Sequence, residues 1–174
     1  MVERHSNPVY LWEEVHGAVH PNARELMTDE FYWSEVDDGS PFGNDTGADT
    51  LADYVRWRSA NPVVSPMEFV SHLLSEWGLI DDYWDVTDEA EVENIMEEDP
   101  LGCRPRDEVA IAVAFAQLAL EGRVDEQLRI RTLNVIKRQL LPCWLEAWKP
   151  DYAPIWKTRL LKMQRVLLNP RVSG

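Results

Sequence analysis

Apolar and polar residues recur with helical spacing along most of the chain. In residues 45–59 the apolar positions lie three or four residues apart, so they share one face of a helix. These positions are Ala48, Leu51, Ala52 and Val55. Residues 107–121 are apolar on all sides, which is typical of a helix in the centre of a bundle. Since strand-like alternation is almost absent, the pattern predicts an all-α fold, a single-domain bundle of about six or seven helices.

Capping signals mark the helix boundaries. Ser65 suits the N-cap, Pro66 suits the first helical position, and Glu68 can reach back to the cap. Gly78 can end this helix in the left-handed conformation. Its expected buried face consists of Phe69, Val70, Leu73, Leu74 and Trp77.

Further helices follow from the same signals. A short helix is expected after Pro21, and an acidic surface helix over residues 88–98. Two more are expected from Asp125 to Pro142 and from Asp151 onward.

The N-terminal part has weaker periodicity. Residues 1–17 are interpreted as an N-terminal arm of one domain formed by residues 1–174. A short two-stranded ribbon near residues 9–34 stays open, because three consecutive aromatic residues, Phe31-Tyr32-Trp33, can form a brief strand.

Composition predicts a folded, cytoplasmic protein. Of the 174 residues, 45% are hydrophobic and eight are tryptophan, enough apolar area to offset the entropy of ordering the chain. No signal-peptide pattern occurs, and the longest mostly apolar run, residues 109–120, is too short to cross a bilayer. Cys103 and Cys143 lie outside any CxxC pair and away from a histidine pair, so we expect plain thiols, with no disulfide framework and no zinc site.

The net charge of -14 is unevenly distributed. Residues 1–101 carry 24 acidic and 4 basic side chains, whereas residues 102–174 carry 7 acidic and 13 basic ones. An acidic field repels phosphate backbones and steers basic partners. Two explanations stay open: an acidic surface that keeps the protein soluble while its two halves attract each other, or a surface for a basic protein partner.

The start of the helix over residues 45–59 is a candidate for chemistry. Asp45, Asp49 and Asp53 are spaced by four, so they lie on one helix face beside Asn44, with enough oxygens for a hard cation. The EF-hand succession is missing, however, and capping and the helix dipole already explain carboxylates in a first turn. We therefore assign no metal here.

A histidine gives the alternative function. If His20 met Asp45 and Asp49 in the fold, the chain could be a small metal-dependent, hydrolase-like enzyme. A single histidine is more often structural. No nucleophile elbow, phosphate-binding loop or dinucleotide fingerprint occurs, so we assign no catalytic residue and no cofactor.

Carboxylates surround two aromatic residues in the run Asp81-Asp82-Tyr83-Trp84-Asp85. A tryptophan or tyrosine among carboxylates can receive an arginine or lysine from a partner. We therefore expect a partner surface at this run, with at least one of the two aromatics exposed and with Glu97 and Glu98 on its rim.

An ordered set of short motifs covers about residues 18–80. The set is His20-Pro21-Asn22-Ala23, Phe31-Tyr32-Trp33, Ser40-Pro41-Phe42-Gly43-Asn44-Asp45, Gly47-Ala48-Asp49-Thr50-Leu51, Tyr54, Trp57-Arg58, Asn61-Pro62 and Phe69. In this order it resembles the YfeS-type group of uncharacterised bacterial proteins. The resemblance implies a bacterial origin and no catalytic residue. The Phe-Gly-Asn-Asp run is also similar, more loosely, to small domains near bacterial toxin and immunity genes.

One feature of that group is missing here. Some YfeS-type chains look as if they contain a WGR module. In this chain Trp77-Gly78 is followed by leucine and is expected to end a helix. A nucleic-acid role based on that module is therefore not expected.

These observations favour a non-enzymatic protein-binding protein, most concretely an immunity or antitoxin-like inhibitor that occludes a basic toxin or effector domain. No nucleic acid and no membrane is expected as a partner, and a homodimer stays open. An assembly subunit, in which the basic C-terminal helix meets the acidic half of a neighbour, is a further alternative.

Overall fold

The computed structural model describes residues 7–174, which form nine α-helices and two short 3-10 helices and contain no strand. Seven of the nine helices have seven residues or more, so the expected all-α single-domain bundle is confirmed. The elements are α1 (Pro8–His16), α2 (Pro21–Leu26), η1 (Glu30–Trp33), α3 (Asp45–Ala60), α4 (Pro66–Glu76), α5 (Glu89–Glu98), α6 (Cys103–Glu121), α7 (Glu126–Gln139), α8 (Pro142–Leu145), α9 (Ala153–Leu168) and η2 (Pro170–Val172).

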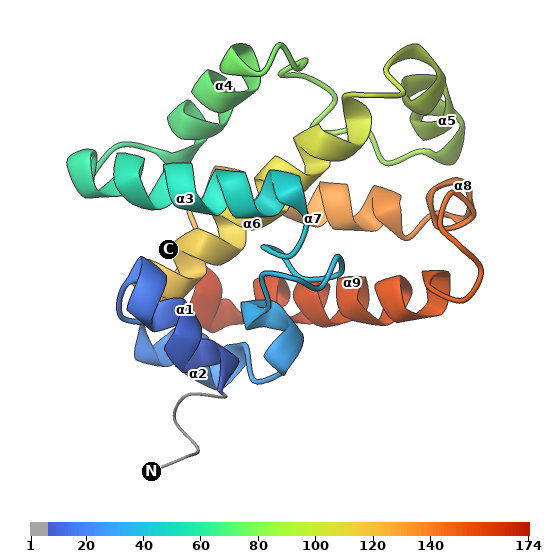
Figure 1. Ribbon diagram of the computed structural model, residues 1–174. Helices are drawn as coiled ribbons and strands as arrows, with labels where there is room; N and C mark the ends of the chain where they lie inside the picture. Colours follow the sequence, from blue (N-terminus) through green and yellow to red (C-terminus); the bar gives the residue numbers. More distant parts are fainter. Residues whose placement is uncertain (1–6) are drawn as a thin grey trace.

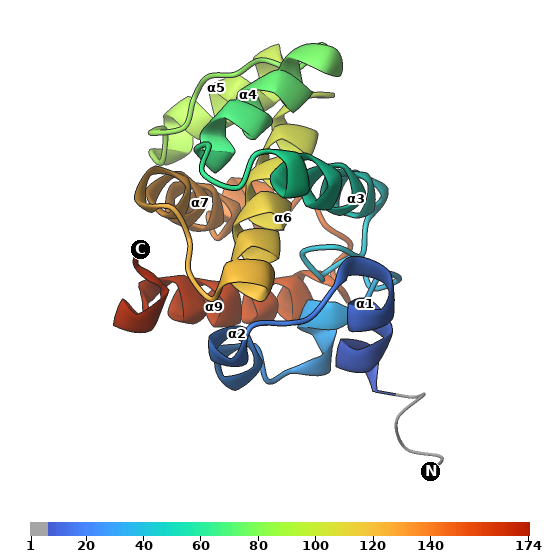
Figure 2. The ribbon, with the colours of Figure 1, turned by 90° about the vertical axis from the view of Figure 1, so that its left-hand side faces the viewer.

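Helix α6 lies in the centre of the bundle (Figures 1 and 2). Helices α2, α3, α4 and α7 pack directly against it, and α9 packs on α7. Every residue from 109 to 119 is buried, which confirms the helix expected from its apolar composition. The helix begins at Cys103, before the expected Asp107, because Pro105 falls in the first turn, where its missing N–H removes no hydrogen bond.

The N-terminal part is helical in the described residues. Residues 1–6 of the expected arm lie outside the described part, but Pro8–His16 is helix α1 and Phe31-Tyr32-Trp33 belongs to a 3-10 helix, so residues 9–34 contain no ribbon. Asn7 caps α1 by accepting a hydrogen bond from the Val9 N–H at 3.0 Å. Trp12 packs edge-on against Trp33, with ring centres 5.6 Å apart. The short helix is thus ordered by an aromatic contact between distant residues.

Most helix starts match the capping signals in the sequence. The side chains of Asn44, Ser65 and Asp88 accept backbone N–H groups at the starts of α3, α4 and α5. Gly78 is left-handed, with a φ of 67°, as expected. Trp77 is not part of the buried face of α4, because it follows the last helical residue and is 37% exposed.

Helix α5 lies at the periphery of the molecule (Figure 1). It packs against α8 through a small hydrophobic cluster, separate from the main core, whose buried members are Val92, Ile95, Cys103 and Trp144. Within residues 7–174, no helix combines the length and the apolar character needed to cross a membrane.

Candidate functional site

Residues 81–98 contain nine carboxylates, and we call this stretch the acidic segment. The segment consists of the loop before α5 and α5 itself, which lie at the same end of the molecule (Figures 1 and 2). Its expected partner-binding carboxylates Asp81, Asp82, Asp85, Glu97 and Glu98 are all exposed.

Basic residues of the C-terminal part neutralise a different group of acids. Lys162 lies 2.6 Å from Asp29, Arg171 lies 2.5 Å from Glu25, and Arg159 pairs with Asp37. Among residues 7–174, none of the nine carboxylates of the acidic segment takes part in an ion pair. The mutual attraction of the two halves therefore accounts for Glu25, Asp29 and Asp37, and it leaves the carboxylates of the acidic segment without a basic partner among residues 7–174.

A buried arginine holds the loop of the acidic segment from beneath. Arg138 of α7 is 2% exposed and makes a two-pronged ion pair with Asp107 of α6, in which its Nε lies 3.0 Å from Oδ2. Its Nη1 also donates to the backbone carbonyls of Tyr83, at 2.6 Å, and Val86, at 3.3 Å. Because the guanidinium is held by a fully buried carboxylate, it can fix the loop backbone in one conformation.

Tyr83 has a strained backbone at this contact. Its φ of 68° lies in the left-handed region, which costs a residue with a side chain on the order of 1–3 kcal/mol. The buried Arg106 guanidinium lies 5.2 Å from the Tyr83 ring centre and pairs with Asp99 at 2.9 Å. Two buried arginines thus stabilise an unfavourable conformation in the middle of the acidic loop.

Trp84 is buried, so the expectation that it is available to a partner is wrong. It is 6% exposed, and its indole N–H donates to the Asp81 carboxylate at 2.8 Å. Its carbonyl accepts from the Asn134 side chain at 3.2 Å, and the Arg131 guanidinium lies 5.5 Å from its ring centre. Tyr83 is half-buried. Both aromatics therefore anchor the loop, and the surface available to a partner consists mainly of carboxylates.

The motif residues of the first helix entrance have structural roles. Phe42 is completely buried, and Asn44 caps α3 by accepting the Gly47 N–H at 2.7 Å. A Cβ atom on Gly43 would lie 1.7 Å from the backbone oxygen of Asp37, so no larger residue fits without moving the turn.

A polar hollow of about 420 Å³ lies next to this entrance. Asn44 and Asp45 line it, together with Arg104 and Glu108 of α6. Burial raises the pKa of Glu108, whereas Arg104, 2.8 Å away, lowers it. Sequence reasoning missed Glu108, because it lies more than 60 residues from Asp45 on a helix interpreted as core.

The structure does not bring His20 and Asp45 together. His20 directly precedes α2. Its ring Nδ1 accepts the backbone N–H of Asn22, and its backbone N–H donates to the Ala119 carbonyl near the end of α6. Asp45 instead lies by the start of α6, where it shares the hollow with Glu108. Since the eleven residues from Glu108 to Ala119 span about 16 Å of α6, His20 and Asp45 do not form a His–carboxylate pair.

The remaining motif residues and carboxylates of the first helix entrance lie on α2 and α3. Pro21 occupies the first position of α2. Asp49 is exposed on α3, and Asp53 pairs with Arg56 on the same helix. His20 and Asp45, two residues of the alternative function, therefore lie near opposite ends of α6.

We expect Mg²⁺, Ca²⁺ and Mn²⁺ to leave the melting temperature unchanged, because within residues 7–174 neither Asp45 nor Asp49 belongs to a group of three acidic, cysteine or histidine side chains whose ligand atoms lie within 4.8 Å of one another. Differential scanning fluorimetry with each ion measures this directly, since an ion that binds only the native state must raise the melting temperature. A rise that disappears in the Asp45→Asn, Asp49→Asn double variant would contradict the expectation and restore the metal interpretation.

Comparison with known proteins gives a relative without a stated activity. The chain is 28% identical over 130 residues to the uncharacterized protein YfeS of Escherichia coli (strain K12). The match covers 74% of this chain and 53% of YfeS, so the chain spans about half the length of that relative. This similarity confirms the resemblance to the YfeS-type group. No protein-family model matches the chain, and no solved structure matches it.

Proposed function

We propose that this chain is a non-enzymatic protein-binding protein whose acidic segment docks onto a basic partner. The proposal rests on one observation: two groups of carboxylates differ in whether basic side chains form ion pairs with them. Glu25, Asp29 and Asp37 are paired with C-terminal arginine and lysine, whereas the nine carboxylates of residues 81–98 have no ion-pair partner within residues 7–174. Such a surface attracts a basic protein over a distance of about one Debye length, ~8 Å at physiological salt.

The support of the loop favours binding of a folded partner. Arg138 and Arg106 hold the loop before any partner arrives, so docking orders few additional backbone groups. A surface that is already ordered loses less conformational entropy on association than a flexible one. Rapid electrostatic capture by a rigid acidic surface suits an inhibitor that must occlude its target quickly.

An immunity or antitoxin-like inhibitor is the concrete form of the proposal. Toxin active sites that act on nucleic acid or other anionic substrates are basic, and an acidic protein surface can cover them. The looser similarity of the Phe42-Gly43-Asn44-Asp45 run to domains near toxin and immunity genes supports this form. The partner would then be the product of a neighbouring gene with a basic surface.

The proposal is tested by the association rate with such a gene product. Reversing charge in Asp81→Lys, Asp82→Lys should slow association about tenfold or more at low salt, and the difference should shrink as salt is added. Because Asp81 accepts the Trp84 indole N–H, a second variant, Glu97→Lys, Glu98→Lys, separates charge from loop structure. Stopped-flow fluorescence at several salt concentrations measures both.

The matched control makes the same charge change elsewhere. Asp49 and Glu68 are exposed on α3 and α4, outside the acidic segment. Asp49→Lys, Glu68→Lys should slow association much less. An association rate that responds neither to salt nor to the acidic-segment variants would refute the steering mechanism.

A further inference from the structure

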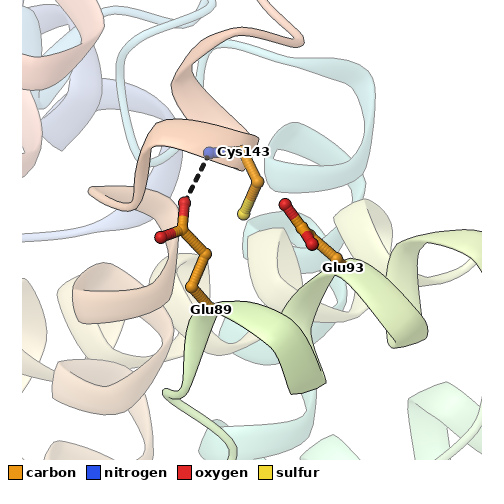
Figure 3. Close-up of side chains that lie close together, drawn as sticks. All are labelled: Glu89, Glu93 and Cys143. Carbon is orange, nitrogen blue, oxygen red and sulfur yellow. Dashed lines mark hydrogen bonds between the residues drawn. The ribbon is translucent and has the colours of Figure 1, made fainter.

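Three potential metal ligands converge where α5 meets α8. Glu89 and Glu93 lie one helical turn apart on α5, and Cys143 lies at the start of α8 (Figure 3). One ligand atom from each of the three side chains lies within 4.8 Å of the other two. The Glu89 carboxylate also accepts the backbone N–H of Cys143 at 3.3 Å, which orients it toward the thiol.

Packing between the two helices produces this convergence. Val92 and Ile95 of α5 and Trp144 of α8 belong to one buried hydrophobic cluster, so the two helices have a defined relative position. Glu89 and Glu93 lie on the turns of α5 that face Cys143 (Figure 3). In the sequence, Cys143 is 54 residues from Glu89 and 50 residues from Glu93. The thiol is thus an independent donor, brought to the carboxylates by the tertiary fold.

The negative charges of Glu89 and Glu93 are not neutralised by a basic side chain of residues 7–174. Neither Glu89 nor Glu93 forms an ion pair with a lysine, arginine or histidine of residues 7–174, and an oxygen of one carboxylate lies within 4.8 Å of an oxygen of the other. Two like charges at this separation repel each other, and α5 carries no basic residue to offset them. A bound divalent cation would convert that repulsion into attraction.

We propose that Glu89, Glu93 and Cys143 form a zinc site. Zn²⁺ binds cysteine sulfur at about 2.3 Å and carboxylate oxygen at about 2.0–2.2 Å, and it accepts three protein ligands with water in the fourth position. Tetrahedral coordination at those bond lengths places the ligand atoms about 3.3–3.6 Å apart, so small side-chain rotations would close the site. Mg²⁺ and Ca²⁺ prefer oxygen ligands alone, which makes the thiol selective against them.

Zinc at this position would join α5 to α8. The small cluster around Val92 and Ile95 is otherwise the main packing that holds α5. A cation that links the two helices would therefore stabilise the end of the molecule that carries the acidic segment. This inference goes beyond the proposed function and does not depend on it, because the site can be tested without any protein partner.

The test uses the full chain with Co²⁺ and Zn²⁺ alone. Co²⁺ should produce a near-ultraviolet absorption band from sulfur-to-cobalt charge transfer, which Zn²⁺ should remove by displacement. Zn²⁺ in large excess over its dissociation constant should raise the melting temperature by about 5 °C. Cys143→Ser should abolish the band, and Glu93→Gln should weaken Zn²⁺ binding about tenfold or more.

Two control variants keep the test specific. Cys103→Ser removes the other cysteine of the chain, which is buried in the same cluster, and should retain the band. Glu97→Gln removes an exposed carboxylate from the same helix and should leave Zn²⁺ affinity unchanged. Because Glu93 is exposed, Glu93→Gln should fold normally even if Cys143→Ser does not.

Several results would overturn the proposal. These are the absence of a cobalt band in the unmodified chain, a band that persists in Cys143→Ser, and a zinc affinity equal in Glu93→Gln and Glu97→Gln. None of these results would bear on the association rate with a basic partner, so failure of the zinc site is distinguishable from failure of the proposed function.

Discussion

Replacing Arg138 with methionine is expected to lower the free energy of unfolding by about 3–5 kcal/mol. The change leaves the Asp107 carboxylate, which is 0% exposed, without its cation. It also removes the donor to the Tyr83 and Val86 carbonyls. Removal of one partner of a buried ion pair is costly because the remaining charge has neither water nor a counter-charge.

Urea unfolding followed by tryptophan fluorescence measures this loss. The control is Arg56→Met, because Arg56 forms an ion pair with Asp53 on the surface of α3 and its side chain is 77% exposed. That variant should lose less than about 1 kcal/mol. A similar loss in the two variants would contradict a central role for the buried pair.

A double variant separates the two contributions of Arg138. In Asp107→Leu, Arg138→Met no buried charge remains, so much of the lost stability should return if the unpaired carboxylate is the main cause. If the double variant stays as unstable as Arg138→Met, the lost hydrogen bonds to the loop carbonyls dominate. In either case the acidic loop should become more mobile, and hydrogen exchange of the residue 81–86 amides should speed up.

Gly43→Ala is expected to destabilise the protein by about 2–3 kcal/mol. The added methyl group would lie 1.7 Å from the Asp37 carbonyl oxygen and 2.4 Å from its carbonyl carbon. Both are backbone atoms, so the turn that supports Phe42 and the Asn44 cap has to move as a whole. Thermal or urea unfolding measures the change.

The control for Gly43→Ala is Gly78→Ala. Gly78 has a positive φ of 67°, but a Cβ atom there would meet nothing within 4 Å. That substitution should therefore cost only about 1 kcal/mol, from backbone conformation alone. If Gly43→Ala costs no more than Gly78→Ala, the close approach of the Asp37 backbone is not what requires glycine.

The motif around Gly43 and the acidic segment differ in what their residues do in the fold. The Phe42-Gly43-Asn44-Asp45 run carries the resemblance to the YfeS-type group, and its buried ring, tight turn and helix cap explain it without any chemistry. In the acidic segment Asp81 and Asp88 also make structural hydrogen bonds, whereas Asp85, Glu97 and Glu98 are exposed and take part in no ion pair within residues 7–174. A partner is therefore better sought at residues 81–98 than at the motif.

Local sequence signals were sufficient for most of the helices. Asn44, Ser65 and Asp88 each cap a helix that begins at the next residue, because a capping side chain acts on N–H groups only two or three positions away. The apolar character of residues 109–119 likewise predicted the buried central helix. The weakly periodic Pro8–His16 was missed, because its order depends on the contact between Trp12 and Trp33.

Only the tertiary structure decided which polar groups meet. Four findings depend on how helices distant in the sequence pack together. They are the burial of Trp84, the separation of His20 from Asp45, the carboxylates of residues 81–98 without a basic partner among residues 7–174, and the convergence of Glu89, Glu93 and Cys143. By itself, the sequence determined that the chain forms an all-α bundle with an acidic first part and a more basic last part. Helix formation and capping depend on neighbours within about four residues, whereas ion pairing and burial depend on how the helices pack together.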